Sequence, residues 1–161
     1  MYEYPERKSP RATFHDYAVG DYFVTICTKG KQHFFGKIFD GDMHLSPIGT
    51  IANLQFADIS KHYSYAQALL WVVMPNHVHA IIRIKIERMR ETGRSPLSIV
   101  VGGIKRAVTL YAQRNNIVFG WQSRYHDHII RGTHDGNNIA EYIQTNVERW
   151  DNDCFNEYAN R

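Results

Sequence analysis

The sequence predicts an α+β fold in which helices pack on one antiparallel, ferredoxin-like sheet. Short segments alternate apolar and β-branched residues, two Ser-Pro pairs precede helical patterns, and neighbouring strands are separated by helices. The chain of 161 residues suits one domain. We expect an arm at residues 1–20 and a single domain at residues 21–161.

The first half of the chain contains two expected strands, a short third piece and a helix. Residues 21–28 (DYFVTICT) and residues 33–39 have the composition of strands, and a turn at Gly41-Asp42 precedes a short piece at residues 43–45. Ser46 followed by Pro47 is typical of a helix start, because serine caps the first turn and proline fits the first helical position. Apolar residues then continue at helical spacing to residue 63.

The second half repeats this order. Residues 66–73 and 77–86 are apolar runs joined by a tight turn, which predicts two neighbouring strands. Ser95-Pro96 begins a second helix, in which the pair Gly102-Gly103 indicates a close backbone approach. A short strand at residues 126–131 and a third helix at residues 135–150 complete the expected fold.

Composition excludes several classes of protein. Two cysteines are too few for a disulfide-stabilised secreted domain, and the charged N-terminal sequence lacks the apolar region of a signal peptide. The longest apolar run, at residues 68–74, is too short to span a bilayer. We therefore expect a soluble, cytoplasmic protein without a membrane partner.

Two histidines stand out on the predicted strand at residues 77–86. His77 and His79 are two positions apart, so their side chains leave the same face of the sheet, whereas Val78, Ala80 and Ile82 face the core. Such a pair can bind a divalent ion if another element supplies a third ligand. A strand can equally carry two histidines without any metal.

The last predicted helix offers a third ligand. Tyr142 and Asn146 are four residues apart and share a helix face, where the amide can offer an oxygen to a metal and the phenol an oxygen to a substrate. Two nitrogen ligands and one oxygen ligand suit Mg²⁺ or Mn²⁺ in phosphoryl transfer, and imidazole ligation favours Mn²⁺. Alternatively, Tyr142 packs beside Ile139 and Ile143 as part of the core.

Charge is unevenly distributed, although the net charge is only +3. Residues 83–106 hold seven Lys or Arg against two Glu, a net of +5, and residues 133–161 hold two basic against six acidic residues, a net of −4. A basic stretch beside the histidines favours a phosphate-rich partner, although a solvated loop has the same composition. The candidate DNA contacts are Arg83, Lys85, Lys105 and Arg106.

A further polar cluster, Asp127 and His128, lies in the string YHDHIIR. Asp127 could orient a histidine or a metal-bound water from outside the ligand set, or it could cap the neighbouring loop. The sequence leaves both interpretations open.

Four segments together resemble a known family. The string MPNHVHAII at residues 74–82 resembles the HUH motif (histidine, large hydrophobe, histidine) of single-tyrosine HUH transposases, and is most similar to REP-associated tyrosine transposases. The segments YFVTICT, WQSRYHDHIIR and YIQTN agree in the same order, and the likeness covers about residues 16–153.

The resemblance implies a fold, a metal and a mechanism. It implies a ferredoxin-like sheet with the histidines on a central strand, Tyr142 as the nucleophile, and His77, His79 and Asn146 as ligands of Mg²⁺ or Mn²⁺. Tyr142 would attack a phosphorus of single-stranded or hairpin DNA, giving a 5′-phosphotyrosine and a free 3′-OH. Relatives usually carry proline where this chain has Val147, a change that could let the helix continue past Asn146.

Other readings share some of these features. A relative without catalytic activity would bind DNA hairpins only, and a replication-initiator or relaxase-type nickase would use the same chemistry in another role. A zinc hydrolase is disfavoured because no general-base glutamate lies near the histidines. Tyr125 and Tyr111 are rival nucleophiles, and both a monomer and a homodimer are compatible with the sequence.

Overall fold

Four strands form the central antiparallel sheet of the computed structural model, which describes residues 19–86 and 93–156. Their order is β4-β5-β1-β6. Helical connections lead from β1 to β4 and from β5 to β6, so order and connectivity are those of a ferredoxin-like sheet, as predicted. The strands are β1 (Val19–Cys27), β4 (Ala66–Met74), β5 (His77–Lys85) and β6 (His126–Ile129), and the connecting helices are α1 (Pro47–Ala57) and α3 (Pro96–Arg114).

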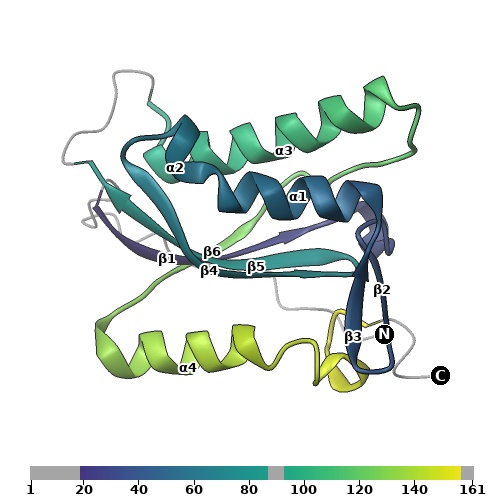
Figure 1. The fold of residues 1–161 in the computed structure, drawn as a ribbon. Helices are drawn as coiled ribbons and strands as arrows, with labels where there is room; N and C mark the ends of the chain where they lie inside the picture. Colours follow the sequence, from purple (N-terminus) through teal and green to yellow (C-terminus); the bar gives the residue numbers. More distant parts are fainter. Residues whose placement is uncertain (1–18, 87–92, 157–161) are drawn as a thin grey trace.

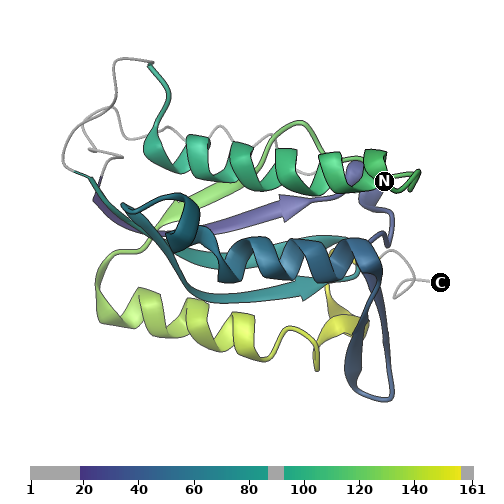
Figure 2. The ribbon, with the colours of Figure 1, turned by 45° about the horizontal axis from the view of Figure 1, so that its top comes forward.

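Helices cover both faces of this sheet. Helices α1, α2 (Ile59–His62) and α3 lie on one face, and α4 (Gly132–Gln144) lies on the other, as Figures 1 and 2 show. The main core lies on the α1–α3 face, where alternate strand residues are fully buried. These residues are Tyr22, Val24, Ile26, Val78, Ala80 and Ile82.

A two-stranded hairpin stands apart from the central sheet. It consists of β2 (Gly36–Phe39) and β3 (Asp42–Leu45), and in Figure 1 it reaches from the end of the sheet towards the level of α4. The strand predicted at residues 33–39 begins only at Gly36, because Phe34 and Phe35 pack their rings against Phe119. Before the hairpin, a short 3₁₀ turn, η1 (Lys29–Lys31), follows β1.

The two predicted Ser-Pro caps are present. The Ser46 hydroxyl accepts a hydrogen bond from the Gly49 amide at 3.1 Å, and the Ser95 hydroxyl accepts one from Ser98 at 3.2 Å. The first helix is shorter than predicted, because the chain turns at Asp58 between α1 and α2. Inside α3, a Cβ atom on Gly103 would collide with the Tyr63 hydroxyl, so the close approach at this glycine is made by a side chain and not, as predicted, by the backbone.

The ends of three other elements differ from the prediction. Strand β1 begins at Val19, two residues before the predicted domain start, and residues 1–18 of the expected arm lie outside the described residues. Strand β6 stops at Ile129, after which the Ile130 amide bonds to Asp21.

Helix α4 spans residues 132–144 rather than 135–150, so Val147 does not prolong it past Asn146. At its end the backbone tightens, and the Asn146 amide N–H donates to the Ile143 carbonyl at 3.3 Å. A 3₁₀ turn, η2 (Trp150–Asn152), follows. Within residues 19–86 and 93–156, no helix combines the length and apolarity needed to cross a membrane.

Candidate metal and nucleophile site

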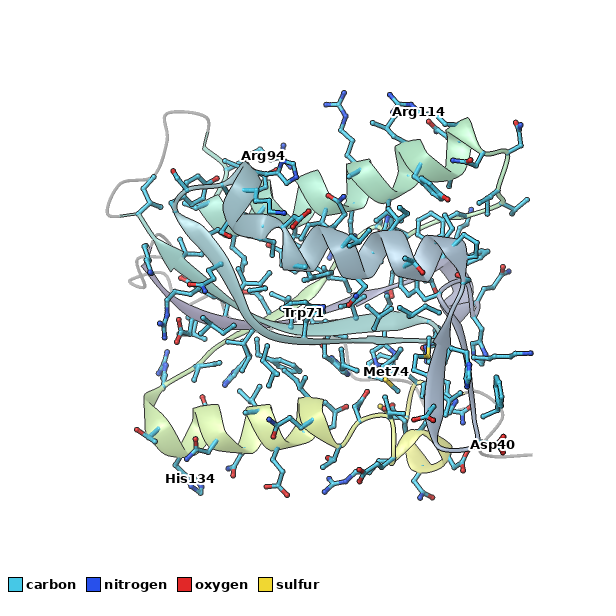
Figure 3. All side chains as sticks on the ribbon, in the orientation of Figure 1. Asp40, Trp71, Met74, Arg94, Arg114 and His134 are labelled. Atoms are coloured by element: carbon cyan, nitrogen blue, oxygen red, sulfur yellow. The ribbon has the colours of Figure 1, made fainter. Side chains whose placement is uncertain are left out.

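Both histidines of the HVH string project from β5 towards α4. In the register of the sheet, His77 lies opposite Cys27 and Met74, and His79 lies opposite Thr25 and Val72. Figure 3 shows Met74 on the same α4 side of the sheet. The two imidazole rings are 4.4 Å apart between centroids, and both side chains are fully buried. The predicted pairing on one face is therefore present.

The hydrogen bonds of Asn76 fix the orientation and tautomer of His77. The Asn76 amide nitrogen donates to the carbonyls of Lys31 and Phe155, at 3.1 and 2.7 Å. Its oxygen therefore faces His77 Nδ1, at 2.8 Å. Because that oxygen can only accept, Nδ1 carries the proton and Nε2 of the neutral ring presents a lone pair.

Asn146 is oriented in a comparable way by a carboxylate. Its amide nitrogen donates to Asp153 Oδ2 at 3.2 Å, which turns Oδ1 inwards. The Asn146 amide favours the protonated form of His77 and so acts to raise the pKa of that ring. The amide therefore lies beside His77. Oδ1 nevertheless has no hydrogen-bond partner of regular geometry. An unprotonated ring nitrogen and an amide oxygen, both acceptors, thus lie next to each other.

His79 is held by a hydroxyl on the neighbouring strand. Thr25 Oγ1 is 2.8 Å from His79 Nδ1, so this ring also has its Nδ1 occupied and its Nε2 directed elsewhere. Burial lowers the pKa of His79 to about 3. Burial first, and then the proximity of His79, hold the pKa of His77 well below its ordinary value. Both rings are therefore neutral near pH 7, as metal ligation requires.

These donors fit a divalent cation. Within this site, three buried atoms have no hydrogen-bond partner: His77 Nε2, His79 Nε2 and Asn146 Oδ1. Buried polar atoms are rarely left unpaired, and a bound cation satisfies lone pairs that no proton reaches. The described residues contain no metal-binding group of three His, Cys, Asp or Glu side chains, but the third donor predicted here is an amide.

Tyr142 lies directly against these donors. Its ring centroid is 5.1 Å from that of His79 and 6.2 Å from that of Phe23, and the side chain is half-buried. Burial raises the pKa of the phenol above its ordinary value; the charges of Asp153 and Cys154 act in the same direction, and Asn146 acts against them. The structure thus brings Tyr142 and the three donors together.

The two rival tyrosines lie elsewhere. The Tyr125 hydroxyl is 2.9 Å from Ser98 in α3, and Tyr111 is itself part of α3 and packs against the core. Helix α3 covers the face of the sheet opposite to α4 (Figure 1). Neither phenol is therefore near the histidine pair.

Several neighbours of the site were not predicted from the sequence. Thr25 could have been found from the period-two alternation that places Phe23, Thr25 and Cys27 on the face opposite the core. Asp153 and Phe155 lie in an irregular segment without a periodic signal, yet the Phe155 ring is 4.4 Å from His77. Trp150, at 6.1 Å from His77, helps Phe155 to cover the pair.

The structure separates the four predicted DNA contacts. Arg83 and Lys85 follow the histidines on the same face of β5, but Arg83 forms a two-pronged ion pair with Asp21 at 2.7 and 2.8 Å. Lys105 and Arg106 belong to α3, on the other face, where the Lys105 ammonium donates to the Gln122 carbonyl at 2.8 Å. The basic stretch is therefore not one patch beside the histidines, and its residues 87–92 lie outside the described residues.

Asp127 and His128 also differ from the expected arrangement. Asp127 pairs with Val24 in the register of the sheet and so lies on the core face, away from the candidate metal ligands. His128 is on the α4 face, but its ring bonds to Asp135 Oδ2 at 2.9 Å near the start of α4. Asp135 also accepts from the Arg131 amide at 2.9 Å, so this pair anchors the helix rather than the histidines.

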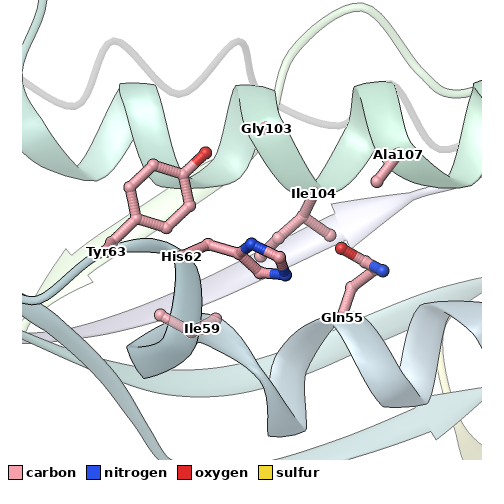
Figure 4. A pocket seen from close by; sticks show the side chains of 7 residues that line it. All are labelled: Gln55, Ile59, His62, Tyr63, Gly103, Ile104 and Ala107. Carbon is pink, nitrogen blue, oxygen red and sulfur yellow. The ribbon is translucent and has the colours of Figure 1, made fainter.

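A cavity is present on the opposite side of the sheet. It measures about 220 Å³ and lies between α1, α2 and α3 (Figure 4). Its lining consists of Gln55, Ile59, His62, Tyr63, Gly103, Ile104 and Ala107. It contains none of the predicted site residues.

Comparisons with known proteins identify the fold and a relative. The structure of a REP-associated tyrosine transposase bound to a REP hairpin superimposes with a TM-score of 0.60 at 19% identity, over 83% of this chain and 69% of that one. A candidate transposase from Deinococcus radiodurans has 15% identity and a TM-score of 0.47, over 78% of this chain and 88% of its own. No family model matches the chain.

The fold is therefore that of the REP-associated tyrosine transposase, as the resemblance implied. In sequence, an uncharacterised protein of Haemophilus influenzae is 33% identical over 165 aligned positions, which cover 91% of each chain. The chain belongs to the same family as this protein.

Proposed function

We propose that this protein is a metal-dependent DNA strand transferase that cleaves and rejoins single-stranded DNA through a covalent tyrosine intermediate. One observation carries the proposal. Three buried atoms that could ligate a metal have no hydrogen-bond partner, and they lie beside a half-buried tyrosine. The transposase fold and the hairpin DNA bound by the structural neighbour favour the same substrate class.

His77, His79 and Asn146 would hold the metal, through the three atoms that lack other partners. When bound, a Mg²⁺ or Mn²⁺ ion supplies a Lewis acid that polarises the scissile phosphate and offsets its developing negative charge. Asn76 and Thr25 keep the two rings in orientation, and Asp153 does the same for Asn146.

Tyr142 would perform the nucleophilic step. Its phenolic oxygen forms a bond to phosphorus while the bond between phosphorus and the 3′ oxygen breaks. The phenol proton passes to water and the departing 3′ oxygen takes up a proton, leaving a 5′-phosphotyrosine and a free 3′-OH. Because a phosphodiester-type bond is conserved, another 3′-OH can reverse the step and rejoin strands without ATP.

The raised pKa of Tyr142 sets a condition on this step. At neutral pH the phenol is protonated, so the attacking oxygen must lose its proton as the bond to phosphorus forms. A positive charge close to Tyr142 would favour the anionic phenolic oxygen. This condition, together with the unpartnered atoms of the two histidines and Asn146, supports a bound cation at the site.

Capture of the covalent intermediate tests the proposal. The full chain is incubated with Mn²⁺ or Mg²⁺ and a labelled pool of DNA hairpins carrying randomised single-stranded flanks, and adducts are resolved under denaturing conditions. We expect an adduct with the native protein and with Tyr111→Phe, and none with Tyr142→Phe. No adduct from the native protein, or a phosphotyrosine mapped to another residue, would overturn it.

The same experiment separates a non-catalytic hairpin-binding protein from the transferase. The covering of the donors by Phe155 and Trp150 is the observation that favours this second function. A hairpin-binding protein would slow the migration of the labelled hairpins in a gel-shift assay and give no covalent adduct with either metal.

A further inference from the structure

Lys31 lies at the edge of the candidate site in a backbone conformation that lysine seldom adopts. Its φ angle is 53°, in the left-handed region, and it follows Gly30 with a φ of 60°. The conformation costs a non-glycine residue free energy and persists only where surrounding contacts enforce it; such outliers gather at functional sites. Here the surrounding contacts lead directly to His77.

One amide side chain connects the Lys31 backbone to the candidate metal donors. The Lys31 carbonyl accepts from Asn76 Nδ2 at 3.1 Å, and Asn76 Oδ1 accepts from His77 Nδ1 at 2.8 Å. Thr28 braces the same turn, because its hydroxyl donates to the carbonyls of Gln32 and Asn76 at 2.7 and 3.0 Å. The turn and the histidine ring are thus fixed relative to each other.

The Lys31 side chain extends over the same aromatic ring that covers His77. Its ammonium is 5.9 Å from the centroid of Phe155, and that ring is 4.4 Å from His77. The positive charge of Lys31 also acts on His77, whose pKa it lowers. Lys29, in the same turn, instead packs its aliphatic chain beside Gly120.

The proposed chemistry requires a cation at this place. The attacked phosphate gains negative charge, and the carboxylate of Asp153 is already close to Tyr142. Arg83, the first basic side chain after the histidines on β5, is engaged by Asp21. Building on the proposed function, we propose that Lys31 is a phosphate-binding residue, whose ammonium contacts a non-bridging oxygen of the DNA phosphate seated beside the histidine pair.

Salt-dependent DNA binding tests this assignment separately from catalysis. The probe is a DNA hairpin with a single-stranded oligothymidylate flank, and binding is measured in EDTA with Tyr142→Phe as the parent protein, so that neither metal nor covalent chemistry contributes. For Lys31→Met we expect weaker binding, by about tenfold, and a log–log salt slope reduced by about 0.7, the value for one contact to a single strand. Lys29→Met is the matched control and should retain the parental slope.

The outcomes separate the two proposals. An unchanged slope in Lys31→Met, or an equal loss in Lys29→Met, overturns the role of Lys31 even if the native protein forms the covalent adduct. A loss confined to Lys31→Met upholds it, even if no adduct forms and the transferase proposal fails. Lys31→Arg should restore the slope, and Lys31→Gly should lose it while melting at a higher temperature, which excludes misfolding as the cause.

Discussion

The two faces of the central sheet are built from the same strands but serve different ends. On the α1–α3 face, Val78, Ala80 and Ile82 are fully buried among apolar side chains. On the α4 face, the alternating residues His77 and His79 are just as deeply buried, yet each keeps a ring nitrogen without a partner. Burial on the first face stabilises the fold. Burial of unpartnered lone pairs on the second face costs free energy, which the packing of the first face offsets.

The largest expected effect is a loss of folding stability in acid, caused by the two buried histidines on the α4 face. The unfolded chain protonates both histidines below their ordinary pKa of 6.5, whereas the folded protein keeps them neutral, His79 down to about 3. The unfolded state then binds more protons, so stability falls with falling pH. Between about pH 7.5 and about pH 5 we expect the metal-free protein to lose about 4 kcal/mol through the two rings.

Urea unfolding across this range measures the effect. His79→Gln should roughly halve the pH dependence, because one of the two groups is gone. The exposed variant His134→Gln is the control, since His134 lies on the outer side of α4, pointing away from the sheet (Figure 3), and should leave the slope unchanged. Equal slopes in all three proteins would contradict neutral burial of the pair.

The apolar face should respond to loss of volume rather than to pH. Ile82 is completely buried between the sheet and the helices, so Ile82→Ala should lower the free energy of unfolding by about 3 kcal/mol through lost burial and a residual cavity. The loss should be the same at neutral and at mildly acidic pH. Thermal and urea unfolding at both pH values check this, and a loss below about 1 kcal/mol would contradict the close packing of this face.

A divalent metal should stabilise the folded protein by binding to the polar α4 face. Because the metal would bind the folded donors and not the unfolded chain, Mn²⁺ at 100 times its Kd should add about 2.7 kcal/mol of stability. The melting temperature should rise in the native protein and stay constant in His77→Leu. Glu141→Gln, an exposed change on α4, should behave as the native protein does. A rise in His77→Leu as large as in the native protein would place the metal elsewhere.

How far the sequence predicts each face follows from the range of the interactions involved. The apolar alternation in β1 and β5 and the two Ser-Pro caps are local, so these two strands were predicted to within two residues and the starts of α1 and α3 were predicted correctly. The same alternation places His77 and His79 together. The end of α4 was not predicted, because the turn at Asn146 is held by Asp153, which follows in an irregular segment.

The orientation of His77 depends on contacts that are distant in sequence. Asn76 reaches Lys31 and Phe155, 45 and 79 residues away, and no local pattern contains those distances. For the same reason, the sequence left open whether Asp127 orients a histidine or caps a loop, whereas the register with Val24 turns it to the core face. Register is set by the packing of the whole sheet, and a shift of one residue reverses every side chain.

The smallest expected effect distinguishes a strained functional residue from a strained turn. Lys31 and Asn116 both have a φ of 53°, but Lys31 lies beside the polar face and Asn116 follows the end of α3. Replacing either by glycine removes the steric conflict, so each variant should gain about 0.5 kcal/mol in urea unfolding, less for Asn116 because asparagine tolerates this region better. Only Lys31→Gly should lose affinity for the oligothymidylate-flanked hairpin. An equal loss of affinity in Asn116→Gly would contradict this distinction, because it would show that releasing a left-handed backbone, and not removing the Lys31 ammonium, weakens DNA binding.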